Sequence, residues 1–235
     1  MRAIITSPLF AVAATVAVYF AAQRLYLRFR YFWLNPVLIS IAGLIILLKI
    51  LGLDFRTYNQ GGRIISFFLG PAVVALGMVL HQQWQTVRAH WASLGVSVLA
   101  ASLVGIVSAA GCAIILGASP EAAASLAPKS VTTPIAIGIT AKLGGLEPLT
   151  AALVVSAGVL GAVFGPPFLK LIGVRDPLAY GLAMGASSHG IGTARALQDG
   201  PLPGAASSLA ICLNGLATAI LAPPIMWLMR WVLPS

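Results

Sequence analysis

The sequence is poor in charged side chains, and acidic residues are the scarcest of all. It has 235 residues, of which 8% are charged, with five Asp and Glu against 14 Lys and Arg. A soluble domain of this length needs far more polar surface. All the acids lie in expected loops or at the ends of apolar segments, which disfavours a proton pump built on a carboxylate relay inside a membrane. They are Asp54, Glu121, Glu147, Asp176 and Asp199.

Cysteine and histidine are also rare. The two cysteines, Cys112 and Cys212, lie in apolar runs and have no Cys or His partner at metal-ligand spacing. We therefore expect no disulfide framework, no metal site and no cofactor. The Lys and Arg side chains that give the net charge of +9 are scattered between apolar runs. This favours the anionic headgroups of a lipid bilayer and an anionic solute as partners, and no nucleic acid.

Apolar residues, in contrast, make up 59% of the chain. They form about eight segments of about 20 residues, the length that crosses a bilayer. The sequence therefore predicts an all-α integral membrane protein, with residues 1–235 as a single polytopic membrane domain. The segments are 7–27, 34–53, 63–83, 91–117, 128–143, 147–172, 177–198 and 204–231.

The orientation in the membrane stays open. Arginines after the first segment favour a cytoplasmic position for the first loop, but other loops that would lie on the opposite side of the membrane also carry basic residues.

Some of these segments are expected to be interrupted and related to one another. The segment 128–143 is short and contains Pro134, so it is expected to be a broken or re-entrant helix. An Asn-Pro pair opens an apolar run at Asn35 that reaches a Gly-Pro pair at Gly70, and a Thr-Pro pair opens a similar run at Thr133. These two similar runs indicate possible inverted-topology repeats, 34–117 and 128–231. Coincidence is the alternative explanation, because Gly and Pro are frequent in membrane helices.

The first candidate site precedes Pro134, where a lysine and three hydroxyl side chains lie together. Hydroxyl side chains cap helix N-termini, and the free backbone N–H groups there favour an anion. A carboxylate could be held by these amides, the hydroxyls and the Lys129 ammonium group. The alternative is a capped helix with Lys129 reaching the lipid headgroups. The candidate residues are Lys129, Ser130, Thr132 and Thr133.

The second candidate site lies in the middle of the segment 177–198. Its glycines each cost about 1 kcal/mol in a helix, and an ionisable side chain such as His189 is rare at membrane depth unless it faces a cavity or protein. Imidazole titrates near neutral pH, so a proton could accompany the substrate. The alternative is a structural histidine bonded to a neighbouring helix. The candidate residues are Ser187, Ser188, His189, Gly190, Gly192 and Thr193.

No catalytic constellation accompanies these residues in the sequence. Ser188 and His189 are adjacent, no acid lies nearby to orient the imidazole, and the spacing fits no hydrolase motif. We therefore expect that the protein is not an enzyme. A weaker third group of candidates, Asn35, Gly70 and Asn214, could break or polarise helices within the bilayer. Asn214 could equally hold helices together.

Three stretches carry a specific resemblance: 69–76, 128–136 and 188–194, with the sequences LGPAVVAL, PKSVTTPIA and SHGIGTA. Because of the order and spacing of these stretches, the chain from about Asn35 to its C-terminus resembles the LrgB/CidB family. The resemblance implies a multi-pass protein of the bacterial plasma (inner) membrane, with relatives in the plastid envelope. Many bacterial members are encoded beside a small LrgA/CidA-type membrane protein, which implies a hetero-complex. We also expect a homo-oligomer.

The family is described in two ways. Its members are described as carriers of small monocarboxylates, with plastid relatives exchanging glycolate and glycerate, and as antiholin-like regulators of murein hydrolase export and autolysis. A carrier needs an anion-sized polar site between broken helices, whereas a regulator needs only oligomerising spans. We therefore predict a carrier of small monocarboxylates or 2-hydroxy acids (glycolate, glycerate, lactate or pyruvate), coupled to protons or another ion. Its helix breaks at 129–134 and 187–193 should converge near the bilayer midplane.

Overall fold

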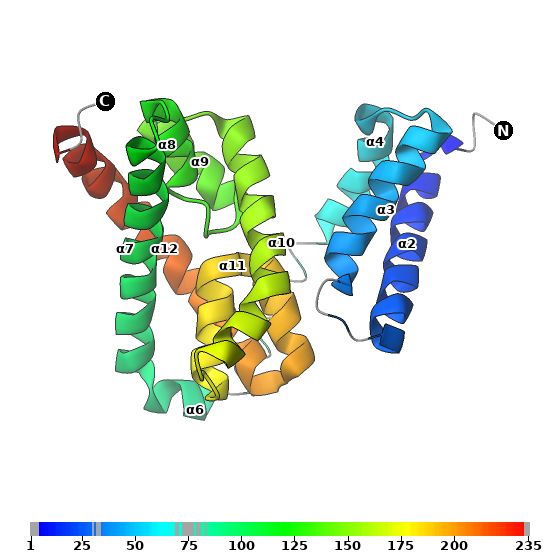
Figure 1. Cartoon of the computed structure of the whole chain (residues 1–235). Coiled ribbons are helices and arrows are strands. Elements are labelled where there is room, and N and C mark those ends of the chain that lie inside the picture. Colours follow the sequence, from blue (N-terminus) through cyan, green and yellow to red (C-terminus); the bar gives the residue numbers. More distant parts are fainter. Residues whose placement is uncertain are drawn as a thin grey trace. The chain divides into compact units, whose positions relative to one another are not determined.

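The computed structural model describes residues 5–29, 31, 34–68, 71, 78, 81–82 and 84–232, and the regular secondary structure of these residues is helical. This confirms the prediction of an all-α protein. The chain forms two compact units, an N-terminal unit of residues 1–76 and a C-terminal unit of residues 77–235. Figure 1 shows the helices of both units. A single polytopic domain for the whole chain stays a prediction.

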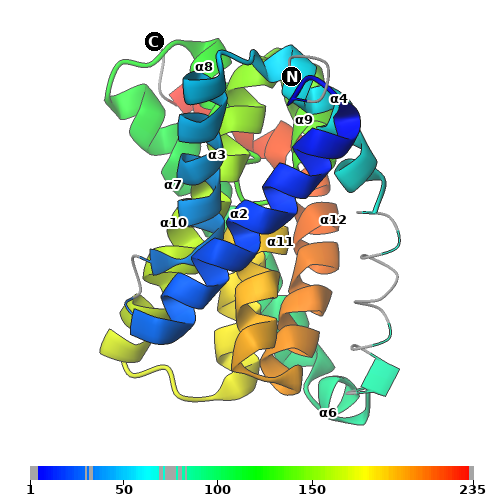
Figure 2. The same ribbon diagram turned by 90° about the vertical axis from the view of Figure 1, so that its right-hand side faces the viewer.

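The described N-terminal unit contains α2 (Pro8–Phe29), α3 (Pro36–Leu51) and α4 (Phe55–Phe67). Helix α2 lies against both of the others (Figure 2). The hydroxyl groups of Thr15 in α2 and Tyr58 in α4 share a hydrogen bond of 2.8 Å. Most of the predicted segment 63–83 falls outside the described residues, and its beginning belongs to α4, which starts earlier than predicted.

The described C-terminal unit contains α6 (Trp84–Ala89), α7 (Trp91–Ile115), α8 (Pro120–Leu126), α9 (Thr133–Leu143), α10 (Glu147–Leu171), α11 (Pro177–Asp199) and α12 (Pro201–Val232). By length and apolar composition α7, α10 and α12 can cross a membrane, as can α2 in the N-terminal unit. Helices α7, α10 and α12 extend from one end of the C-terminal unit to the other (Figure 1).

Helices α8 and α9 form a re-entrant hairpin, the first hairpin (residues 120–143). It starts shortly after α7 ends and returns to the same end of the unit, where α10 begins (Figure 1). Its turn reaches deep into the unit, because Ser130 is linked through Asn214 to Ser102, which lies about 20 Å along α7 from that end. This confirms the expectation of a re-entrant helix at 128–143, of which α9 is the returning arm.

Helix α11 is a second re-entrant hairpin (residues 177–199), which corrects the expectation of a membrane-spanning length at 177–198. Tyr180 donates a hydrogen bond to Asp199, nineteen residues later, whereas a continuous helix would hold them about 28 Å apart. The reversal occurs at His189, whose backbone angles are φ 43° and ψ −132°. The segment therefore does not cross, and both of its ends lie at the end of the unit where α12 begins.

Crossing helices and hairpins alternate along the C-terminal unit. Helix α7 and the first hairpin are followed by α10 and the second hairpin, and α12 completes the order. Because α7 and α10 run in opposite directions, the hairpins enter from opposite ends of the unit (Figure 1). This is the relation of inverted-topology repeats. The two stretches related in this way are 91–143 and 147–199, and the repeat halves 34–117 and 128–231 stay a prediction.

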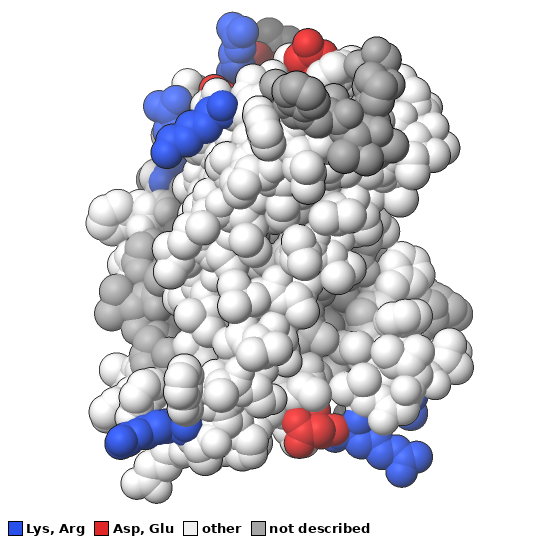
Figure 3. All heavy atoms as spheres, turned by 90° about the vertical axis from the view of Figure 1, so that its left-hand side faces the viewer, with Lys and Arg blue, Asp and Glu red and all other residues white. Residues whose placement is uncertain are grey.

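The surface between the ends of the crossing helices is apolar. Figure 3 shows charged side chains gathered at the two ends of one face, with an uncharged surface between them. Large apolar side chains are exposed on the crossing helices, among them Leu103, Leu160 and Ile220. An apolar belt bounded by charged ends is the surface that a lipid bilayer requires. The protein is therefore a membrane protein.

Candidate functional site

Asn214, near the middle of α12, is buried and ties the turns of both hairpins together. Its side-chain amide donates to the carbonyl oxygens of Ser130 in the first hairpin (3.1 Å) and Ala186 in the second (3.0 Å). Its Oδ1 accepts a hydrogen bond of 2.6 Å from Ser102 of α7. A buried carbonyl left without a partner costs about 1–3 kcal/mol. The two predicted helix breaks therefore converge on one side chain.

The turn of the first hairpin (residues 127–132) leads into the uncapped start of α9. Thr132 occupies the N-cap position and makes no side-chain capping bond, and Pro134 lies in the first turn after Thr133. The backbone N–H groups of that turn can therefore meet an anion. Lys129 is half-buried on the same turn, and its Nζ donates to Ser130 Oγ at 3.0 Å.

His189, at the reversal of the second hairpin, is buried and bonds to α10. Its Nε2 lies 2.9 Å from the carbonyl oxygen of Val154. Since a carbonyl can only accept, Nε2 carries the proton. This bond is what a structural histidine would make. It does not account for the φ angle of 43°, a conformation that costs a non-glycine residue about 1–3 kcal/mol and that clusters at functional sites.

Most candidate residues around His189 are buried in contacts with other helices. Ser188 and Thr193 are 0% and 1% exposed. The Thr193 hydroxyl donates to the His189 carbonyl oxygen at 3.0 Å and is bonded to the Ser207 hydroxyl of α12 at 2.7 Å. Gly192 is buried too, because the two arms of the hairpin approach each other there too closely for a Cβ. These residues hold the turn in place.

Ser187 and Gly190 are the exposed members of the same group. The Ser187 hydroxyl donates to the Ala183 carbonyl oxygen at 2.7 Å and lies 3.0 Å from Ser188 Oγ. The space beside Gly190 is open: among the described residues, no heavy atom beyond its chain neighbours and the adjoining helix backbone lies within 4 Å of where its Cβ would be. Of the residues predicted in this segment, these two can meet a solute without displacing a packed neighbour.

A line of glycines on α10 receives the second hairpin. Gly158, Gly161 and Gly165 lie on one face of the helix, at spacings of three and four residues. A Cβ on the first would approach the imidazole to 2.7 Å, and one on the second would overlap the Ser188 side chain. A Cβ on the third would lie 2.8 Å from the sulfur of Met184. The hairpin therefore needs these positions to carry no side chain.

Two candidates remain, Asn35 and Gly70. Asn35 belongs to the N-terminal unit and caps α3, because its Oδ1 accepts from the backbone N–H groups of Val37 (2.9 Å) and Leu38 (3.3 Å). These bonds stabilise the start of α3, and a part for Asn35 in a substrate site stays a prediction. Gly70 lies outside the described residues.

Sequence reasoning missed the partners that complete the cluster. Ser102 and Ser207 are buried hydroxyls within apolar helices, and each bonds to a residue that the sequence did single out. Both residues could have been found from the sequence as hydroxyl side chains inside otherwise apolar segments. Within the described residues, no group of three or more His, Cys, Asp and Glu side chains is placed to hold a metal ion.

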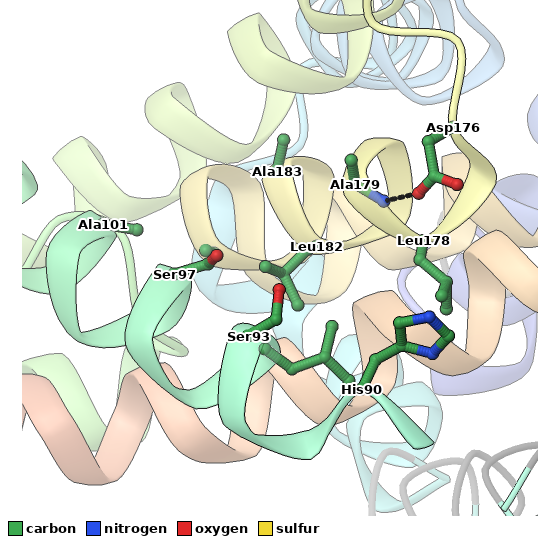
Figure 4. A pocket seen from close by; sticks show the side chains of 11 residues that line it. His90, Ser93, Ser97, Ala101, Asp176, Leu178, Ala179, Leu182 and Ala183 are labelled. Atoms are coloured by element: carbon green, nitrogen blue, oxygen red, sulfur yellow. Dashed lines mark hydrogen bonds between the residues drawn. The ribbon is translucent and has the colours of Figure 1, made fainter. Parts of the chain in front are cut away.

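Cavities approach the hairpins from both ends of the C-terminal unit. One of about 460 Å³ lies between α7 and the first arm of α11, and its lining runs from His90 and Asp176 to Ala101 and Ala186 (Figure 4). Another, of about 230 Å³, follows α9 from Lys142 to Pro134 on the side of α12. Both end beside a helix break.

This fold and cluster define a polytopic membrane protein with opposed re-entrant hairpins. The chain belongs to the LrgB-like family, whose sequence pattern matches residues 15–228. It is 37% identical to the uncharacterized protein YxaC of Bacillus subtilis over 214 residues (91% of this chain and 93% of the relative). It is 30% identical to the antiholin-like protein LrgB of the same organism over 218 residues (92% and 94%). No solved structure matches the chain.

Proposed function

We propose that this protein is a carrier of small monocarboxylates in the bacterial plasma membrane. The observation that carries the proposal is the meeting of two opposed re-entrant hairpins at Asn214, deep inside a unit bounded by crossing helices. Non-helical backbone at membrane depth is tolerated where it is buried in protein or lines a cavity. Broken helices that meet near the midplane are how secondary transporters build substrate sites.

The polar groups of the first hairpin favour a single carboxylate as the ligand. The uncapped start of α9 offers backbone N–H groups, and Lys129 supplies one positive charge on the same turn. A dicarboxylate or phosphate would bring a second charge into a poorly hydrated site, where an unpaired ion costs several kcal/mol. The exposed hydroxyl of Ser187 can pair with the hydroxyl of a 2-hydroxy acid such as glycolate or lactate.

His189 is the group that we assign to ion coupling. Its Nε2 is committed to the Val154 carbonyl oxygen, so the other ring nitrogen is the one that takes up a proton. No chemistry on the substrate is required, and we propose that the protein is not an enzyme. A homo-oligomer and a small LrgA/CidA-type partner are compatible with the apolar exposed surface and belong to the same proposal.

An antiholin-like regulator of murein hydrolase export is the alternative function. It is supported by the names of relatives such as the antiholin-like protein LrgB of Bacillus subtilis. A regulator that acts through oligomerising spans has no need of two converging hairpins or of a strained histidine at their meeting point. The carrier accounts for both features.

Uptake into proteoliposomes tests the carrier directly. The purified protein should accumulate labelled glycolate, lactate or pyruvate, and unlabelled lactate should compete whereas succinate and phosphate should not. Lys129→Ala should weaken uptake at least about tenfold, the effect of losing about 1.4 kcal/mol of a charge-assisted contact. Lys170→Ala, which removes an exposed lysine in the last turn of α10, is the matched control. Absence of uptake, or equal competition by succinate, would reject the proposal.

A further inference from the structure

The cavity between α7 and α11 extends from one end of the C-terminal unit to the level of Asn214. Its lining on α7 runs from His90 to Ala101, a rise of about 16 Å at about 1.5 Å per residue. That is about half of a hydrocarbon core of about 30 Å. Directly above it, Ser102 and the Ala186 carbonyl bond to Asn214, so the cavity stops where the hairpin turns are tied together.

The lining of this cavity has polar side chains at the mouth and small ones at the deep end, and its wall also includes Leu94, Leu178 and Leu182. His90 and Asp176 lie at the mouth, and the exposed hydroxyls of Ser93 and Ser97 follow one turn apart on α7 (Figure 4). The deep end is formed by alanines, among them Ala101, Ala183 and Ala186. Such a lining leaves room for water and offers it hydrogen bonds along the way.

A second groove on the same helix provides a contrast. It has a volume of about 220 Å³ and is lined only by Gly95, Val98, Leu99 and apolar residues of α12. No side chain in that lining can bond to water, so the groove suits the acyl chains of lipid. Ser97 and Leu99 therefore lie on the same turn of α7 and face different surroundings.

The basic residues of the C-terminal unit favour a cytoplasmic position for the cavity mouth. Because neither hairpin crosses, the loops on both sides of α11 lie at the same end of the unit as the start of α7. Lys and Arg are enriched in cytoplasmic loops. That end carries Arg88, Lys170, Arg175 and Arg195, and the opposite end carries Lys142 and Arg230.

We propose that this cavity is a water-filled vestibule through which a small anionic solute reaches the hairpin turns from the cytoplasm. The identity of the solute rests on the proposed carrier function, whereas the presence of water in the vestibule does not. The layer of Ser102, Asn214 and Ala186 closes its inner end. The carboxylate at the mouth, Asp176, caps α11 by accepting a hydrogen bond of 2.8 Å from the Ala179 N–H.

Single cysteines test the vestibule without any transport assay. Cys112 and Cys212, both exposed, are first replaced by serine. Ser97→Cys and Ala101→Cys then probe the vestibule, and Leu99→Cys probes the apolar groove as the matched control. The probe is a charged, membrane-impermeant methanethiosulfonate, applied separately to each side of oriented vesicles, because only a hydrated thiol forms the reactive thiolate.

Ser97→Cys and Ala101→Cys should react from the cytoplasmic side about tenfold or more faster than Leu99→Cys, since hydration controls the thiolate fraction. Equal rates for all three variants would overturn the vestibule, and faster reaction from the opposite side would overturn its orientation. Ser93→Cys, nearer the mouth, should react faster still. The variants should also be tested with glycolate present, which should slow the labelling of Ala101→Cys. Fast labelling in a protein that takes up no glycolate would retain the vestibule and reject the carrier.

Discussion

The two hairpins achieve the same reversal by different local means. The first turns through residues 127–132, a loop with Pro128 at its start and Pro134 just beyond it. The second turns at one residue, His189, without a proline. The first turn packs Val131 into the apolar core, while the second fixes an imidazole on a neighbouring backbone. A helix break at proline is determined by the local sequence, whereas a break at one strained residue depends on contacts with a neighbouring helix.

Removing Asn214 should produce the largest effect, because both hairpins depend on it. Asn214→Leu leaves the Ser130 and Ala186 carbonyls and the Ser102 hydroxyl without their partner, which should destabilise the protein by about 3 kcal/mol or more. Thermal melting in detergent should show a clear decrease in Tm, and uptake should be lost. Ser102→Ala keeps both carbonyl bonds and should cost less, about 1–2 kcal/mol. Equal melting of Asn214→Leu and the parent protein would show that the hairpins are held elsewhere.

Filling the space on α10 should affect the second hairpin selectively. In Gly158→Ala the new Cβ would lie 2.7 Å from the imidazole, so the ring must move and the hairpin loses about 1–3 kcal/mol. Gly138→Ala, in the returning arm of the first hairpin, meets no atom within 4 Å and should be neutral or stabilise by up to about 1 kcal/mol. Melting temperatures of the two variants decide this. A loss in Gly138→Ala as large as in Gly158→Ala would contradict the difference drawn between the hairpins.

Two replacements of His189 separate strain from bonding. His189→Ala loses the bond to Val154 and keeps the positive φ, whereas His189→Gly loses the bond and relieves the strain. His189→Gly should therefore be more stable than His189→Ala by about 1 kcal/mol or more. Chemical denaturation of both variants measures the difference. If the alanine variant is the more stable one, the backbone at this residue is not strained.

The proton role of His189 has its own test. His189→Gln retains a hydrogen-bond donor but cannot titrate, so the pH profile of uptake should lose its step near neutrality. The parent protein and Ser188→Ala, a neighbouring change that leaves the imidazole in place, serve as controls. An unchanged pH profile in His189→Gln would make the imidazole structural and require the coupling ion to bind elsewhere.

Interactions at the base of the second hairpin, where its two arms end, should contribute least to the stability of the protein. Tyr180 and Arg195 both bond to Asp199 there, and the Arg195–Asp199 ion pair of 2.8 Å is partly exposed. Exposed pairs contribute about 0–1 kcal/mol. Asp199→Asn should accordingly lower the melting temperature only slightly. A loss larger than that of Gly158→Ala would mean that the base, and not the turn, holds this hairpin.

The sequence predicted the first hairpin better than the second for physical reasons. Pro134 and the short apolar run of 128–143 mark a break wherever the chain is placed. At His189 the glycines indicate a poor helix but not a reversal. The first arm and the turn pack on the glycine line of α10, and the second arm is held to α12 by the bond between Thr193 and Ser207. Those contacts come from distant parts of the chain, which a local pattern does not contain.

The candidate site shows the same division. Lys129 to Thr133 and Ser187 to Thr193 could be selected because polar groups stand out in apolar segments. Asn214 could be selected as a residue that bonds helices together, but the sequence does not show which helices it joins. For Asn35, the sequence predicted a residue that breaks or polarises a helix, and the structure shows it as the N-cap of α3.

The bonds of Asn214 also fix an order of events during synthesis. Its two carbonyl partners precede it by 84 and 28 residues, so the ribosome has made both hairpins before the side chain that joins them exists. Until α12 enters the bilayer, the carbonyls of Ser130 and Ala186 lack this partner. Because unsatisfied backbone groups are costly in hydrocarbon, we expect the nascent hairpins to stay near water, or within the insertion machinery, until α12 is inserted. Assembly of the centre of this protein is thus a late step that waits for its C-terminal helix.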